Sequence, residues 1–184
     1  MKHYGDIKTI HGYDMEPVDV ICGGSPCQDV SVAGRKEGLS GERSSLFFEE
    51  IRIIKEMREH DRSSGRSDDN IRPRFIVFEN VHGITSSNKG KDFAKVIEEF
   101  IKVVEPNLPS IDVPDKGWPN TGCFYDEMGR WSIAWRLHDA EFWGTPQART
   151  RISLVMDYGG LCAGEVLFER KGLHWNPTES REEG

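Results

Sequence analysis

Two short runs of apolar residues predict buried β-strands. Residues 18–22 form one run, which ends at the pair Gly23 and Gly24, and residues 75–78 form the other. Uninterrupted runs of this length, rich in β-branched and aromatic residues, are typical of strands buried on both faces of a parallel sheet. We therefore expect an α/β protein in which the loops after these strands meet at one edge of the sheet, where ligands bind in such folds.

Apolar positions at spacings of three and four predict two amphipathic helices. The first begins near Leu46, with Ser45 as its cap, Glu49 and Glu50 in its first turn, and a buried stripe of Phe47, Ile51, Ile54 and Met57. The second covers residues 91–104, with Phe93, Val96, Ile97, Phe100, Ile101 and Val104 buried. A third, short helix is expected within residues 161–168.

The remaining segments are expected to be loops and one hairpin. Residues 61–70 are polar and lack periodicity, so we predict a mobile, solvated loop. Residues 107–130 carry many prolines and glycines and predict an irregular excursion, with Trp118 and Phe124 packed locally. Residues 131–137 and 152–156 predict an antiparallel hairpin that closes the sheet.

Length and cysteine content favour one domain in a reducing environment. The chain has 184 residues and four scattered cysteines, and it contains neither a signal peptide nor an apolar run long enough to cross a bilayer. We therefore expect a cytoplasmic protein. Cys22, Cys27, Cys123 and His11 were considered as zinc ligands, but no Cys-x-x-Cys pair is present, so no metal site is predicted.

The net charge of −7 argues against a chain that holds DNA by itself. Lysine and arginine side chains supply most non-specific affinity for the phosphate backbone. A DNA-binding function therefore requires that the basic, DNA-reading part of the molecule lie outside this chain.

Three segments carry candidate chemistry. Cys27 follows the first predicted strand, and Pro26 fixes its own φ and stiffens the turn that presents the thiol. A lone cysteine is more often a small buried apolar residue, but here the neighbouring side chains are polar. Glu79 stands at the end of the second predicted strand and, as a structural residue, would need a salt-bridge partner. Two arginines, at positions 149 and 151, lie on the rim of the predicted hairpin.

In this order, the three segments resemble motifs of the DNA cytosine-5 methyltransferases, as found in prophages and restriction-modification systems. The family's Pro-Cys-Gln, Glu-Asn-Val and Gln-x-Arg-x-Arg motifs match residues 24–34, 78–81 and 147–151, respectively. The resemblance implies a partial Rossmann-like, class I S-adenosylmethionine-dependent methyltransferase fold, in which an antiparallel hairpin closes a parallel sheet.

The resemblance also implies roles for individual residues. Cys27 would attack carbon 6 of a cytosine flipped out of double-stranded DNA, and Glu79 would act at N3. One of Arg149 and Arg151 would bind the carbonyl oxygen of the base and the other a phosphate or Glu79, and the sequence does not assign them. Asp6, Ile7 and Pro26 would bind S-adenosyl-L-methionine, although Asp6 also fits an ordinary turn. The expected DNA contacts are Gln28, Ser31, Arg43, Asn80 and Gln147, with a solvated surface position as the alternative for Arg43.

The family's Phe-x-Gly-x-Gly cofactor loop does not occur in the chain. We therefore expect residues 1–160 to form an incomplete catalytic domain, residues 161–184 to form a tail that leads toward an absent target-recognition domain, and a complementing chain to supply the missing motifs. Two alternatives remain open. One is a non-catalytic remnant or partner subunit, and the other is a hydrolase that uses Cys27 with His82 or His11, for which no third orienting residue is evident.

Overall fold

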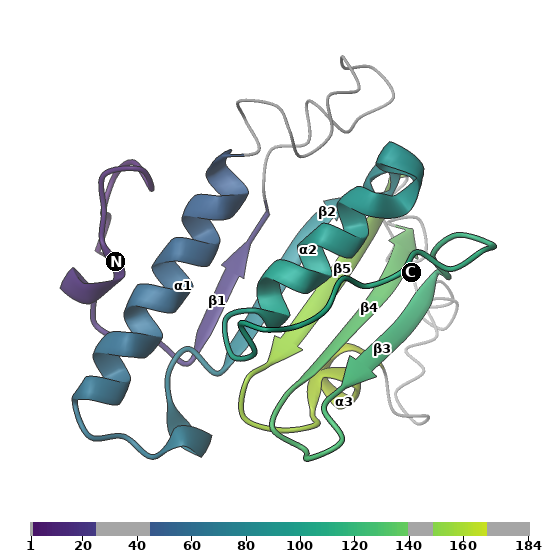
Figure 1. The fold of residues 1–184 in the computed structure, drawn as a ribbon. Coiled ribbons are helices and arrows are strands. Elements are labelled where there is room, and N and C mark those ends of the chain that lie inside the picture. The colour runs from purple at the N-terminus through teal and green to yellow at the C-terminus, as the bar shows by residue number, and fades with distance from the viewer. Residues whose placement is uncertain (1, 25–44, 140–148, 169–184) are drawn as a thin grey trace, which may run out of the picture.

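The chain folds around one mixed, five-stranded sheet (Figure 1). The computed structural model describes residues 2–24, 45–139 and 149–168. Within these residues the strand order is β1-β2-β5-β4-β3. Strands β1 and β2 are parallel, and the other neighbouring pairs are antiparallel. The strand bounds are Val20–Gly23 (β1), Phe75–Val81 (β2), Thr121–Tyr125 (β3), Ser132–Asp139 (β4) and Thr150–Asp157 (β5).

Helices α1 (Ser45–Ser63) and α2 (Lys91–Ile101) cover one face of the sheet, and α3 (Ala163–Leu167) packs on the other. The predicted stripe on α1 is confirmed, because Phe47, Ile51, Ile54 and Met57 are all buried. The centre of the core is an aromatic cluster in which Phe47, Phe78 and Phe100 meet edge to face, with centroids 5.5–5.7 Å apart. One aromatic side chain each from α1, β2 and α2 thus joins both helices to the sheet.

The predicted antiparallel hairpin is confirmed, since β4 and β5 pair along their full lengths. Trp118 packs edge to face against Phe124, as expected, and it also packs edge to face against Phe93 of α2 and Trp135 of β4. The predicted short helix within residues 161–168 is α3. The structure contains no helix, in the part of the chain it describes, with the length and apolar character that crossing a membrane requires.

Three expectations about loops and ends are wrong. Helix α1 extends to Ser63, and Asp61 is only 2 % exposed because it accepts hydrogen bonds from Arg72 and pairs with Arg66. Charge pairing therefore orders the start of the predicted solvated loop. Helix α2 ends at Ile101, three residues early, and continues as a turn. The excursion also contains strand β3, which sequence analysis missed.

Strand β1 forms one edge of the described sheet. Its residues alternate, so that Ile21 faces α1 whereas Val20 and Cys22 lie on the other face and are exposed. Beside them, Phe75 and Val77 of β2 are half-buried and pack with α3 and its neighbours. The expectation that the first strand is buried on both faces is therefore wrong for the described residues, because β1 lies at an edge of the described sheet and leaves an exposed apolar patch there.

A buried ion pair fixes the end of the sheet away from the loops that follow β1 and β2. The Arg74 Nε and Nη2 atoms donate to the two carboxylate oxygens of Asp157, at 2.9 and 3.1 Å. Asp157 is fully buried, and burial alone would raise its pKa. Hydrogen bonds from Arg74 and from the backbone N–H groups of Gly159 and Cys162 outweigh this effect and hold the pKa of Asp157 below its ordinary value.

Candidate functional site

The carboxyl ends of β1 and β2 lie side by side, as the sequence predicted. The parallel register places Gly23 opposite Phe78, so Gly24 lies beside Glu79. A Cβ atom built on Gly24 would lie 2.8 Å from the Glu79 carbonyl oxygen and 3.5 Å from its Oε2 atom. Only glycine fits against the backbone of β2 at this distance. The chain therefore leaves β1, toward residue 27, in contact with Glu79.

Glu79 is held by Arg151. The Arg151 Nε atom forms an ion pair with Glu79 Oε1, 2.8 Å away, and Arg151 Nη1 donates to the Thr150 carbonyl oxygen at 3.0 Å. The two residues meet because β2 and β5 pair antiparallel, with Val81 opposite Arg151. The Glu79 side chain is half exposed. One carboxylate oxygen is thus bound to a fixed guanidinium group, and the other faces Gly24.

The two neighbouring candidates differ in exposure. Asn80 is 2 % exposed, on the face of β2 that packs against the helices, and its Oδ1 atom accepts the backbone N–H of Val81 at 2.8 Å. Arg149 is exposed, and its backbone N–H donates to Asp139 Oδ1 at 3.3 Å. The structure therefore brings Arg151 to Glu79 and leaves the Arg149 side chain at the surface. The other predicted residues of this rim, Pro26, Cys27, Gln28, Ser31, Arg43 and Gln147, lie outside the described residues.

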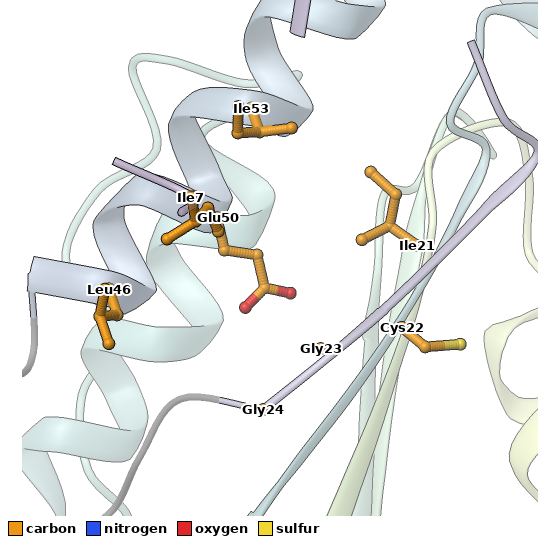
Figure 2. A pocket seen from close by; sticks show the side chains of 8 residues that line it. All are labelled: Ile7, Ile21, Cys22, Gly23, Gly24, Leu46, Glu50 and Ile53. Atoms are coloured by element: carbon orange, nitrogen blue, oxygen red, sulfur yellow. The ribbon is translucent and has the colours of Figure 1, made fainter. Parts of the chain in front are cut away.

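A cavity of about 320 Å³ opens on the α1 side of β1 (Figure 2). The side chain of Ile21 points into it from β1, Leu46 and Ile53 flank it on α1, and Ile7 closes it from the N-terminal segment. The Cys22 side chain points away from it. Its volume falls in the range of small-molecule sites, and its walls are aliphatic.

Arg52 of α1 holds the N-terminal segment, which contributes Ile7 to the cavity lining, against the helix. Its Nη2 atom donates to the carbonyl oxygens of Ile7 and Ile10, each at 3.0 Å, and its Nη1 atom donates to both oxygens of Glu56. Glu56 Oε2 also accepts the N–H of Gly12 at 2.7 Å. Partial burial alone would raise the pKa of Glu56, but these hydrogen bonds outweigh burial and lower it. The segment is therefore tied to α1 at three backbone positions.

The two residues of this segment that were predicted to bind the cofactor, Ile7 and Asp6, lie in different surroundings. Ile7 lines the cavity. Asp6 is exposed, and its Oδ1 atom accepts the backbone N–H of Lys8 at 2.9 Å, within a turn closed by Thr9. In the described structure Asp6 thus acts as a turn residue, which is the alternative that its sequence context left open.

The acidic side chain inside the cavity is Glu50, which sequence analysis did not assign to a site. Glu50 is 7 % exposed, and burial raises its pKa to about 7. The expectation that it occupies the first turn of a helix is wrong, because α1 begins at Ser45. A signal was present in the sequence: Glu50 stands three residues after Phe47 and four before Ile54, on the buried stripe of α1.

Of the cysteines considered as zinc ligands, Cys27 lies outside the described residues, and Cys22 and Cys123 do not converge. Cys22 lies on β1 and Cys123 on β3, and these strands are the two opposite edges of the described sheet. His11 instead lies near Arg52 and Glu56. Across residues 2–24, 45–139 and 149–168, no group of three or more histidine, cysteine, aspartate or glutamate residues has the arrangement of a metal site.

Comparison with known proteins identifies the family. Residues 1–104 match the model of the C-5 cytosine-specific DNA methylase family, and this match covers more than half of the 184-residue chain. The chain belongs to that family. The resemblance drawn from the three motifs is therefore confirmed, and the expected α/β methyltransferase fold agrees with the sheet and helices described above.

Individual relatives are DNA methyltransferases that are longer than this chain. A protein of Escherichia phage P1 named DNA N-6-adenine-methyltransferase is 29% identical over 95% of this chain and 24% of its own length. The Type II methyltransferase M.BsuFI of Bacillus subtilis is 28% identical over 92% of this chain and 32% of its own. The structure of the Entamoeba histolytica methyltransferase EhMeth matches 84% of this chain and 37% of its own, with a TM-score of 0.51 and 13% identity, which supports the fold alone. The chain thus spans about a quarter to a third of these curated relatives.

Family membership implies S-adenosyl-L-methionine as the cofactor, and the cavity fits one end of this molecule. The aliphatic walls suit the faces of a purine ring, and the buried carboxyl group of Glu50 is an acceptor without a partner at its Oε1 atom among the described residues. A Cβ atom on Gly23 would collide with that carboxyl group, so glycine keeps this end of the cavity open. The residues present therefore fit the adenosine part of the cofactor.

Proposed function

We propose that this chain carries the catalytic centre for transfer of a methyl group to carbon 5 of cytosine in DNA, through a covalent adduct on Cys27. The observation that carries the proposal is the geometry of Glu79. Its Oε1 atom is held by Arg151, and its Oε2 atom faces Gly24, three residues before Cys27. A carboxyl group beside the chain that leads to a cysteine, within the family's motifs, suits addition to a pyrimidine ring.

The proposed chemistry begins with the thiolate of Cys27. Carbon 5 of cytosine is a poor nucleophile, and addition of the thiolate at carbon 6 makes the ring electron-rich. Glu79, as a protonated carboxyl group, donates its proton or a hydrogen bond to N3, so that negative charge does not accumulate as the adduct forms. S-Adenosyl-L-methionine, when bound, supplies the electrophilic methyl group. Loss of the proton from carbon 5 and elimination of Cys27 then restore the aromatic ring and the free enzyme.

The neighbouring side chains have positioning and binding roles in this proposal. Arg151 orients Glu79, which leaves Arg149 for the carbonyl oxygen of the base or for a phosphate. Asn80 holds the backbone of Val81 from its buried position. Gln28, Ser31, Arg43 and Gln147 contact DNA beside the target. The cytosine must be flipped out of the duplex, at a cost of roughly a few kcal/mol.

Cytosine is favoured over adenine, although one relative is named for N-6-adenine methylation. An exocyclic amino group carries a lone pair and can accept a methyl group without prior addition of a nucleophile. A cysteine in the Pro-Cys-Gln segment is useful only where the ring must first be activated, as at carbon 5 of cytosine. A product methylated on adenine would overturn this part of the proposal.

We propose in addition that full activity requires a complementing segment that pairs with the β1 edge. The patch of Val20 and Cys22 at this edge is exposed, and an unpaired strand edge is a template for a further strand. The segment would carry the Gly-rich turn that lets backbone approach the methionine end of the cofactor. It can belong to the same protein or to a partner chain.

DNA that contains 5-azacytosine tests the function without knowledge of the target sequence. Genomic DNA from bacteria grown with 5-azacytidine carries this base at many sequences. Thiolate addition at carbon 6, with protonation of the ring nitrogen at position 5, leaves an adduct that resists elimination. In a version of the enzyme that includes the complementing and DNA-reading segments, we expect a protein–DNA adduct that survives denaturation with the wild-type sequence and with Cys22→Ser, and none with Cys27→Ser. An adduct formed by Cys27→Ser would contradict the assignment.

A further inference from the structure

A second cavity, of about 370 Å³, lies at the end of the sheet where β2 begins. Arg58 of α1 lines it together with Gly159, which follows β5. The register of β2 with β5 places Phe75 opposite Asp157 at this end, whereas Glu79 stands near the other end of β2. In Figure 1 the arrows of β1 and β2 point away from this end, toward the rim of the candidate site. The second cavity is therefore separate from that rim.

The lining of this second cavity includes a buried cation, Arg58. Its side chain is 4 % exposed, and the hydrogen bonds it makes in the described structure come from Nη1, which donates to the carbonyl oxygens of Ile71 and Pro73. The Nε atom is buried without a partner. The Cζ atom lies 4.7 Å from the centroid of the Tyr158 ring. Among the described residues, Arg58 thus contacts neutral acceptors and a ring face, and no carboxylate forms an ion pair with it.

A buried charge without a counter-ion is destabilising, because burial removes its water and nothing of opposite charge replaces it. Burial lowers the pKa of Arg58 to about 10, so the group stays charged at neutral pH. A guanidinium group also has five N–H donors, more than acceptors at Nη1 alone satisfy. An anionic ligand in the cavity supplies both the missing charge and the missing acceptors.

Two further guanidinium groups line the cavity and are accessible. Arg62 pairs with Asp68 at 3.6 Å, and Arg130 pairs with Asp126 at 2.7 Å, but the side chains of both arginines are more than half exposed. Water screens such pairs, so either arginine can turn toward a ligand at little cost. Asp69 also lines the cavity and opposes an anion, which makes its charge useful in a test.

The cavity offers apolar surface beside these cations. Trp131 and Tyr158 are buried at its wall, Val104 adds aliphatic surface, and Met128 is 79% exposed. The volume falls in the range of small-molecule sites and exceeds what a bare anion needs. Guanidinium groups bind planar oxyanions through paired hydrogen bonds, and aromatic side chains pack against rings. The combination suits a carboxylate or phosphate group attached to an apolar ring.

We propose that this cavity is a binding site for an organic anion, in which Arg58 receives the carboxylate or phosphate group and Trp131 contacts the ring. The site lies apart from the proposed methyl transfer and does not depend on it. Only the folded chain brings α1, the residues after β5 and residues 128–131 together around the cavity. An anion bound there therefore stabilises the fold as well as neutralising Arg58.

Benzoate and benzamide test the proposal on the full 184-residue chain, because they have nearly the same shape and differ in charge. Phenyl phosphate distinguishes a phosphate from a carboxylate as the anionic group. Binding is followed at pH 7 and constant ionic strength through the Nε–H resonance of Arg58 in the ¹⁵N-labelled chain, which Arg58→Lys assigns by its loss. We expect the tighter of the two anions to bind at least ~10-fold more tightly than benzamide.

Variants locate the site. Arg62→Gln should weaken binding of the tighter anion by roughly 2- to 5-fold, and Asp69→Asn should strengthen it by a similar factor. Arg66→Gln is the matched control, because Arg66 is an exposed arginine that pairs with Asp61 outside the cavity lining, and it should leave the affinity unchanged. Arg58→Gln should remove the preference for the anion over benzamide. If Arg58→Gln does not fold, the variants at exposed positions and the Nε–H signal of the wild-type chain still decide.

Several results would overturn the inference. They are equal affinities for the anions and benzamide, an Nε–H signal of Arg58 that does not shift, and the absence of saturable binding at tens of millimolar. Equal effects of Arg62→Gln and Arg66→Gln, or weaker binding by Asp69→Asn, would place any bound anion elsewhere on the molecule. None of these measurements uses DNA or the methyl donor, so the outcome is independent of the proposed function.

Discussion

Arg151 Nε lies 2.8 Å from Glu79 Oε1, and this contact joins the third-from-last residue of β2 to the second residue of β5. Neither partner is deeply buried, since their side chains are 28% and 50% exposed. A pair of this kind contributes little to folding. Its role is to fix the orientation of the Glu79 carboxyl group.

The first prediction concerns this pair. Arg151→Ala should slow formation of the adduct with 5-azacytosine DNA by about 10- to 100-fold, because Glu79 loses its orientation. The free energy of unfolding should change by less than about 1 kcal/mol. Rates of adduct formation and urea denaturation measure the two effects. The rate of adduct formation by Arg151→Lys should fall between the rates of wild type and Arg151→Ala, because the lysine ammonium group lacks the planar, rigid geometry of a guanidinium group. A rate for Arg151→Ala equal to that of wild type would contradict the positioning role.

The second prediction concerns cofactor binding by the 184-residue chain alone. Its residues fit the adenosine end of S-adenosyl-L-methionine, but they include no Gly-rich turn for the methionine end. Losing the contacts of that end should cost several kcal/mol, which corresponds to a thousandfold or more in affinity at ~1.4 kcal/mol per decade. We expect a dissociation constant near or above ~1 mM by calorimetric titration. Micromolar binding without an added partner would show that the described residues hold the whole cofactor.

The third prediction follows from the pKa of Glu50, which burial raises to about 7. The ordinary value in an unfolded chain is about 4.3. Between these pH values the folded chain holds an additional proton, so the contribution of protonated Glu50 to stability is complete below about pH 4 and is lost as the pH rises through 7. Glu50→Gln removes this dependence. Its free energy of unfolding, relative to wild type, should rise by roughly 2–3 kcal/mol between pH 5 and pH 8.

Urea denaturation at the two pH values measures this change. Glu59→Gln is the control, because Glu59 lies on the exposed side of α1 against Tyr13, and it should show the same pH dependence as wild type. Parallel curves for wild type and Glu50→Gln would mean that the carboxyl group is not buried in solution.

The fourth prediction concerns the buried pair of Arg74 and Asp157. Arg74→Ala should lower the free energy of unfolding by about 3–5 kcal/mol, because the fully buried carboxylate of Asp157 then lacks its charged partner. Arg130→Ala, which breaks the pair of Arg130 and Asp126, should lower the free energy of unfolding far less, since Arg130 is 57% exposed and water screens the pair. Urea denaturation at pH 7 compares them. Equal losses of unfolding free energy in the two variants would show that burial does not determine how much each ion pair contributes to stability.

Strong periodicity made much of the fold predictable. The stripe on α1, the apolar runs of β1 and β2, and the hairpin of β4 and β5 each carry a pattern that is readable within one segment. Strand β3 carries no such pattern, because the side chain that packs on it comes from another part of the sequence. Gly122 lies under the indole of Trp135, where a Cβ atom would collide with the ring, and such packing leaves no local signal.

Part of the candidate site was likewise predictable from the sequence, and part of it was not. Chain order and parallel pairing were enough to place Glu79 beside the chain that leads to Cys27. The choice between the two arginines depends on the register of β2 with β5, which puts Val81 opposite Arg151, and register cannot be read from either strand alone. Glu50 was missed because an acidic residue near a helix start suggests solvent contact, whereas tertiary packing turned it inward.

Helix α1 builds two sides of the cavity from one short stretch. Glu50 projects into it, while Arg52 and Glu56 hold the backbone of Ile7 and Gly12 against the helix. Evolution should therefore constrain these positions in different ways. Residues 52 and 56 depend on each other and should vary together among homologues, as a cation with an anion. Residue 50 should vary independently of them.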